Sequence, residues 1–209
     1  AFAQKNLKGI ELENKVICVP GNHDCDFEKD TTVRKMLLAS MRSGGDSIDK
    51  SVYDTVATLQ DNYRGFAKDM LIDKTLALSI NNNIPIKAGS KTILFRLFNT
   101  AWMSSLREEQ NSIVMPIEMI AQESIDADFV ISLFHHYYSW LAPACDNKSR
   151  FRKNIMKTSN IVLFGHEHTS SSLKINDHYE NEVINEFEGG ALFYSRQGCP
   201  KASAFNSIV

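Results

Sequence analysis

The sequence predicts an α/β protein, in which helices cover a sheet of mainly apolar strands. Apolar segments alternate along the chain with segments of helical spacing, and three of the apolar segments run directly into histidines. Strands that are apolar throughout are buried on both faces, which requires helices over the sheet. The 209 residues fit one domain that spans 1–209, and 43% of them are hydrophobic, enough for a sizeable core.

The first part of the chain predicts one short strand followed by helices. A strand is expected at 15–19, because residues 16–19 are apolar and mostly β-favouring, and a Pro-Gly pair ends it. Residues 31–42 have the apolar spacing of a helix, which the following SGGD sequence stops. A second and less regular helix is expected over 50–70.

The rest of the chain alternates strands and helices. The clearest long strand is expected at 91–102, and a helix at 115–125 follows the next loop. Residues 128–134 form a nearly continuous apolar strand, 148–157 a basic amphipathic helix, and 160–164 another apolar strand. Short strands with hairpin-like connections are expected at 171–175 and 191–195.

Composition excludes several classes of protein. The formal net charge of −2 argues against a dedicated nucleic-acid binder, although the basic helix at 148–157 could still hold phosphates rather than only face solvent. No apolar run approaches the length that crosses a bilayer, so no membrane partner is expected. The cysteines form no C-x-x-C pair and indicate free thiols in a reducing, cytoplasmic compartment: Cys18, Cys25, Cys145 and Cys199.

Three of the expected apolar strands are followed closely by histidine, in the sequences VICVPGNHD, VISLFHHYYSW and IVLFGHEH. Ligands of open α/β sheets bind beyond the carboxyl ends of the strands, so these three ends can meet at one site. Asparagine and histidine side chains with neighbouring carboxylates suit first-row transition metals. Gly165 allows a tight turn before the two histidines of GHEH.

The order of GNHD (21–24), HHYYSW (135–140) and GHEH (165–168) resembles that of the calcineurin-like metallophosphoesterases. The resemblance extends from Val16 to about residue 170 and implies a metallophosphoesterase-type β-sandwich flanked by helices, with its site at one edge. The family's earlier motifs, D-x-H and G-D-x-x-D, do not precede GNHD in this chain. We therefore expect a domain that is incomplete at its N-terminus and belongs to a longer polypeptide with possible further domains.

The resemblance implies two divalent transition-metal ions, which could be manganese, iron, zinc or nickel. It assigns Asn22, His135 and His166 to one ion and His168 to the other. A tyrosine follows the histidine pair where the family has proline, which leaves His136 open as an alternative ligand, although the family's register favours His135.

The two remaining residues of GNHD receive catalytic roles by the same resemblance. His23 would face the substrate phosphate and protonate the leaving oxygen or stabilise its charge, and Asp24 would orient His23 by accepting its second ring proton.

The expected activity is hydrolysis of a phosphoester by a metal-bound hydroxide, with a phosphodiester expected over a monoester and a nucleotide or nucleic acid as candidate substrates. Without the upstream motifs, this chain alone is expected to bind metal weakly and hydrolyse poorly. The alternative is a catalytically degenerate phosphoesterase fold that acts as a binding or regulatory module of a larger protein.

Overall fold

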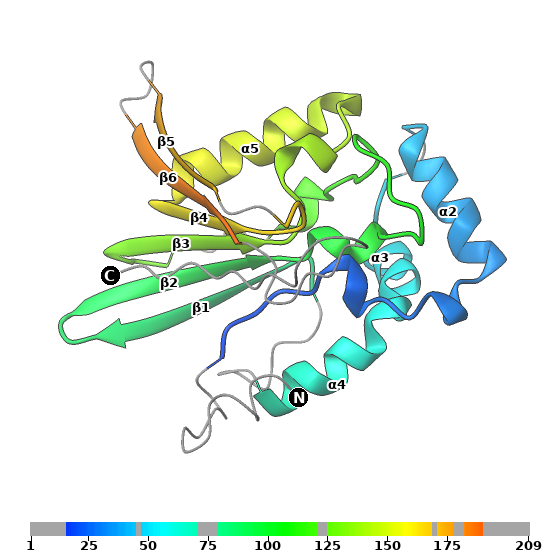
Figure 1. Ribbon diagram of the computed structural model, residues 1–209, viewed down its shortest axis with the longest axis horizontal. Coiled ribbons are helices and arrows are strands. Elements are labelled where there is room, and N and C mark those ends of the chain that lie inside the picture. The colour runs from blue at the N-terminus through cyan, green and yellow to red at the C-terminus, as the bar shows by residue number, and fades with distance from the viewer. Residues whose placement is uncertain are drawn as a thin grey trace, which may run out of the picture.

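One six-stranded mixed sheet, with the order β1-β2-β3-β4-β6-β5, organises the protein (Figure 1). The computed structural model describes residues 16–44, 47–70, 79–120, 125–168, 171–177 and 182–189. The strands are β1 (Asn81–Ala88), β2 (Lys91–Phe98), β3 (Phe129–Phe134), β4 (Ile161–Phe164), β5 (Ser171–Asp177) and β6 (Glu182–Glu188). The helices are α2 (Thr32–Arg42), α3 (Lys50–Val56), α4 (Asp61–Met70) and α5 (Asn147–Thr158).

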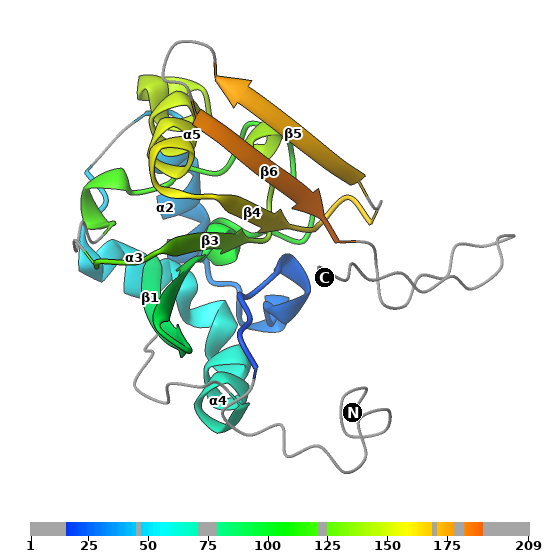
Figure 2. The same ribbon diagram turned by 90° about the vertical axis from the view of Figure 1, so that its left-hand side faces the viewer.

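The centre of the sheet is parallel and its two outer pairs are antiparallel. Strands β2, β3, β4 and β6 pair in parallel, whereas β1 pairs antiparallel with β2 and β5 antiparallel with β6. Figure 2 shows β3, β4, β6 and β5 side by side. The four parallel strands therefore bring their carboxyl ends to the same edge of the sheet, where β2 and β3 are followed by short 3₁₀ turns.

Aromatic packing joins the sheet to α5, which covers one of its faces (Figure 1). The ring of Phe151 on α5 lies 5.3 Å from Phe98 on β2 and 5.7 Å from Phe134 on β3, with the rings edge to face in both pairs. Trp102 follows β2 and is fully buried against Tyr53 of α3, with 5.3 Å between ring centroids. This core holds the carboxyl ends of β2 and β3 in place.

Several sequence expectations are confirmed. The strands expected at 128–134 and 160–164 and the helices expected at 31–42 and 148–157 are present as β3, β4, α2 and α5. The helix expected over 50–70 is present as α3 and α4, with a 3₁₀ turn (Ala57–Gln60) between them. The strand expected at 171–175 is β5. None of the described helices is both long and apolar enough to cross a bilayer.

Other expectations about secondary structure are wrong. Residues 17–20 are not assigned to a strand, and the carbonyl of Cys18 accepts a hydrogen bond from the Tyr63 hydroxyl at 3.0 Å instead of pairing in the sheet. Strand β2 ends at Phe98, because the chain turns into a 3₁₀ segment over Thr100–Met103. Of the helix expected at 115–125, only a 3₁₀ turn at Ile117–Met119 is present. Residues 121–124 and the strand expected at 191–195 lie outside the described residues.

The α/β class is thus shown, whereas the sandwich stays a prediction, since the described residues contain a single sheet. Two of its strands, β1 and β6, were not expected from the sequence. β1 contains Pro85, which is tolerated because β1 is the last strand of the sheet and Pro85 has no backbone N–H to donate to a further strand.

Candidate metal centre

Two neighbouring parallel strands deliver the histidines of the site. β3 ends at Phe134 and continues into His135 and His136, while β4 ends at Phe164 and continues through Gly165 into His166. The backbone N–H of Gly165 donates to the carbonyl of His135 at 3.2 Å, which extends the pairing of the two strands into the site. Of the three strand ends predicted to converge, those of β3 and β4 do so, whereas the segment before Asn22 is not a strand of the sheet.

Asn22 reaches the same point from the N-terminal segment. His135 Nε2 lies 3.0 Å from Asn22 Oδ1 and 3.1 Å from His166 Nδ1. Ligand atoms bound about 2.1 Å from one ion lie about 3.0 Å apart in an octahedral site and about 3.4 Å apart in a tetrahedral one. Both separations from His135 Nε2 therefore match the spacing of ligand atoms on one divalent ion.

A glycine makes this approach possible. A Cβ atom built on Gly21 would lie 2.8 Å from Cε1 of His135 and 2.9 Å from its Nδ1, closer than real Cβ contacts. The backbone before Asn22 thus packs directly on the His135 ring, and any side chain at position 21 would displace that ring.

Thr100 holds the turn after β3 in place. It lies in the segment that follows β2 and is fully buried. Its hydroxyl oxygen accepts the backbone N–H of His135 at 3.2 Å and that of His136 at 2.9 Å. One buried hydroxyl therefore sets the direction in which both histidines leave the sheet.

The environment keeps the histidines neutral. Burial, together with the positive charge of neighbouring imidazoles, lowers the pKa of His135 to about 2. Burial and the charge of His136 lower the pKa of His166 to about 4. A neutral imidazole offers the lone pair that a metal ion needs, so both rings are in the ligand form at neutral pH.

His136 is fully buried and completes a group of three histidines. One ring nitrogen each of His135, His136 and His166 lies within 4.8 Å of the others, so this group could hold a metal ion. It is His135, however, that contacts Asn22 and His166, as the family register favours. His136 Nε2 instead faces the carboxylate of Glu108 at 3.3 Å, and its Nδ1 has no hydrogen-bond partner.

Glu108 was not recognised from the sequence. It lies in the polar SSLREEQNS stretch, where nothing distinguishes it from the acidic residue that follows. Burial raises its pKa, but its hydrogen bond with His136 and the charge of that ring outweigh this effect and bring the pKa below its usual value. A carboxylate thus belongs to the site alongside the predicted asparagine and histidines.

His23 and Asp24 lie in the 3₁₀ turn Asn22–Asp24, and both are exposed. They line a pocket of about 460 Å³ that also includes Asn62 and Tyr63. Asp24 Oδ2 accepts the backbone N–H of Gly21 at 2.8 Å, so this carboxylate closes the turn. Its role in orienting His23 stays a prediction.

The GHEH turn has a strained backbone. His166 and His168 have left-handed conformations, with φ of 80° and 60°, which residues other than glycine rarely adopt. Glu167 lies between them and accepts a hydrogen bond at 2.7 Å from Nε1 of Trp140, whose ring lies 4.3 Å from that of His166. His168 is exposed and, among the described residues, is not part of the three-histidine group.

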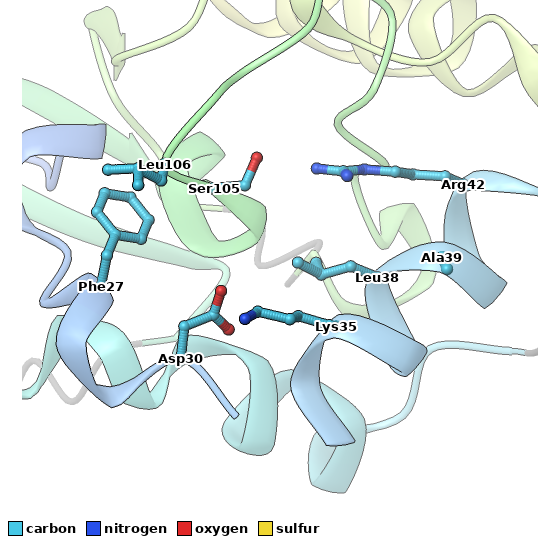
Figure 3. Close-up of a pocket in the computed structure, with 8 residues that line it drawn as sticks. All are labelled: Phe27, Asp30, Lys35, Leu38, Ala39, Arg42, Ser105 and Leu106. Carbon is cyan, nitrogen blue, oxygen red and sulfur yellow. The ribbon is translucent and has the colours of Figure 1, made fainter. Parts of the chain in front are cut away.

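A second pocket of about 340 Å³ lies beside α2 and is lined by residues other than those of the site (Figure 3). Lys35 points toward the carboxylate of Asp30 in this pocket, and Ser105 and Leu106 form the opposite wall. These two wall residues begin the loop that carries Glu108.

The described residues therefore include a group that could hold a metal ion. A comparison with models of known protein families finds no match, and a comparison with curated proteins finds none either. The function is accordingly inferred from the residues and their geometry.

Proposed function

We propose that this chain forms part of a metal-dependent phosphoester hydrolase, most suited to phosphodiesters. The observation that carries the proposal is the convergence of Asn22 Oδ1, His135 Nε2 and His166 Nδ1, with separations of 3.0 and 3.1 Å. These atoms come from three segments that the sequence resemblance had assigned to one ion. A three-residue oxygen and nitrogen set of this kind suits manganese, iron, zinc or nickel.

The bound metal would supply charge neutralisation for a phosphate group and a lowered pKa for a water molecule. Asn22, His135 and His166 would hold the first ion. His168 would contribute to a second ion, whose other ligands the family draws from D-x-H and G-D-x-x-D motifs that do not precede GNHD here. The left-handed backbone at His166 and His168 supports this arrangement, because such strain is typically retained where side chains must be aimed.

His23 would act on the substrate rather than on the metal. It is exposed, it is adjacent to Asn22, and it lines the pocket of about 460 Å³ beside the site. An imidazole in this position can protonate the leaving oxygen, which is worth about 10²–10⁴-fold in rate. Asn62 and Tyr63, which also line that pocket, would offer polar groups to the rest of the substrate.

A metal-containing binding module without catalysis is the second candidate. The exposed position of His168, outside the three-histidine group, favours it, since the described donors supply one ion position and not two. The first candidate turns over a substrate and the second does not, so a measurement of metal content alone does not distinguish them.

The test compares two variants of the full-length protein. His166→Ala should lose metal and activity together, because a methyl group cannot refill a coordination position. His23→Ala should keep its metal and lose about 10²–10⁴-fold in turnover of an unactivated phosphodiester. The loss should shrink with a nitrophenyl ester, whose leaving group needs no proton. Glu109→Gln, an exposed change in a neighbouring loop, is the control.

Metal analysis and kinetics with both substrates decide between the outcomes. A His23→Ala protein without metal would make His23 a ligand and overturn its proposed role. A wild-type protein that binds metal but hydrolyses no member of a phosphodiester panel would favour the binding module.

A further inference from the structure

Glu108 is turned inward although its neighbours in the loop face solvent. Its side chain is 9% exposed, whereas Leu106, two positions earlier, is 78% exposed, and Arg107 and Glu109 on either side are exposed as well. Burying a carboxylate is costly unless it is paired. The exposure of the loop to solvent therefore does not explain why this one carboxylate points into the site.

Glu108 pairs with one imidazole of the site and faces a second one at a longer distance. Both carboxylate oxygens lie 3.3 Å from His136 Nε2, and Oε2 lies 3.9 Å from His166 Nε2. The opposite nitrogen of His166, Nδ1, is the atom that lies 3.1 Å from His135 Nε2. His166 is thus placed between Glu108 on one side and the candidate metal position on the other.

We propose that Glu108 is a positioning residue of the metal centre, which fixes the proton on Nε2 of His136 by hydrogen bonding and, through its charge 3.9 Å away, favours the proton on Nε2 of His166, so that each Nδ1 keeps its lone pair. An ionised carboxylate only accepts hydrogen bonds, so a ring nitrogen that faces it carries a proton. Carboxylates that accept from the far nitrogen of a metal-binding histidine fix its tautomer and ring orientation in this way. His166 is then presented to an ion through Nδ1.

The surroundings of His136 support the same tautomer. Its Nδ1 is buried and has no hydrogen-bond partner. A proton on Nδ1 would be a buried donor without an acceptor, and the lone pair left on Nε2 would face a carboxylate. Both costs disappear when the proton is on Nε2.

The effect on metal affinity rests on the proposed function, whereas the effect on the tautomers does not. The proposed role of Glu108 is therefore tested in two ways. The first is ¹⁵N NMR of the imidazoles in the metal-free protein, and the second is the Zn²⁺ affinity measured in competition with a chelator. Wild-type protein should show Nε2–H for both His136 and His166. If the protein proved to have no hydrolase activity, the tautomers and the Zn²⁺ affinity could still be measured and would still test the role of Glu108.

Three variants separate the possible roles. Glu108→Met removes the acceptor but fills the space, and we expect mixed tautomers and a Zn²⁺ affinity about 10–100-fold lower. Glu108→Gln keeps a carbonyl acceptor and should retain the tautomers and most of the affinity. Glu109→Gln, the exposed neighbour, should match wild type. Thermal unfolding of the metal-free proteins verifies that each variant is folded.

Unchanged tautomers in Glu108→Met would overturn the proposal. So would a Glu108→Gln protein that loses as much affinity as Glu108→Met, because an acceptor alone would then not suffice. A Glu108→Met protein that binds no Zn²⁺ while its tautomers persist would make Glu108 a direct ligand and would also overturn it. Should Glu108→Met not fold, the tautomers of wild type and Glu108→Gln decide, since Nδ1–H in either one contradicts the proposal.

Discussion

A Cβ atom on Gly21 would lie 2.8 Å from Cε1 of His135, so the backbone of GNHD and the ring that follows β3 are packed without space for a side chain. Gly21→Ala should push the His135 ring away from Asn22 and His166. We expect a loss of about 1–3 kcal/mol in stability from overpacking and at least about a tenfold loss in Zn²⁺ affinity. Chemical denaturation and metal competition measure the two effects.

Gly165→Ala is the matched control for this prediction. The nearest atom to a Cβ on Gly165 is Nδ1 of His135 at 3.9 Å, an ordinary contact. This variant should stay close to wild type in both measurements. Equal losses in the two glycine variants would show that the close packing of Gly21 on His135 is not what the site depends on.

Arg34 should be a major source of stability beside the site. It is 1% exposed, and its guanidinium donates to the carbonyls of Val56 and Ser104, both at 2.7 Å, and to Asp30 at 3.2 Å. Arg34→Met should cost about 3–5 kcal/mol, because it leaves Asp30 without its ion-pair partner and buried carbonyls without donors. The shift of the urea midpoint measures this cost.

Arg42 of the same helix provides the comparison. It is exposed and makes one hydrogen bond, at 3.3 Å to the carbonyl of Ser112. Arg42→Met should change stability by no more than about 0.5 kcal/mol. If Arg34→Met lost less than about 1 kcal/mol of stability, which is roughly what an exposed ion pair contributes, the buried network described above would be contradicted.

Trp140 should stabilise the strained GHEH turn through its indole N–H. Trp140→Phe keeps an aromatic ring against His166 but loses the 2.7 Å hydrogen bond to Glu167. We expect about 0.5–1.5 kcal/mol of lost stability and a lower Zn²⁺ affinity. Glu167→Gln retains an acceptor oxygen and should lose less of both. If Trp140→Phe binds Zn²⁺ as tightly as wild type, the indole does not hold the turn.

The described cysteines should differ widely in reactivity. Burial raises the pKa of Cys25 to about 11 and also raises that of Cys18, whereas Cys145 is exposed. The thiolate is the reactive form, so iodoacetamide at pH 8 should modify Cys145 long before Cys25. Peptide mapping over a time course measures the rates. Rapid modification of Cys25 in the folded protein would be inconsistent with its half-buried position and raised pKa.

The candidate site could be predicted from the sequence where metal-binding side chains directly follow a strand. Strands β3 and β4 are short, apolar and followed at once by histidines, so both the elements and His135 and His166 could be predicted. Asn22 was predicted although its own segment is not a strand of the sheet. The motif, and not the secondary structure, identified that residue.

The remaining parts depend on tertiary packing that leaves little trace in the sequence. Strand β6 was missed because Glu186 and Glu188 occupy buried positions, 1% and 7% exposed, which removes the apolar alternation of a strand. Glu108 was missed because an inward carboxylate and an outward one in a polar loop look alike. Only the fold shows which of them meets two histidines.

The three donor atoms come together across long stretches of chain, with 113 positions between Asn22 and His135 and 31 between His135 and His166. Contacts of such long range form only after most of the sheet has assembled, so a partly folded chain lacks the complete set. An ion that binds only the native state at 100 times its Kd adds about 2.7 kcal/mol to stability. The supply of divalent metal during synthesis would thus influence how much of the newly made protein survives in the folded form.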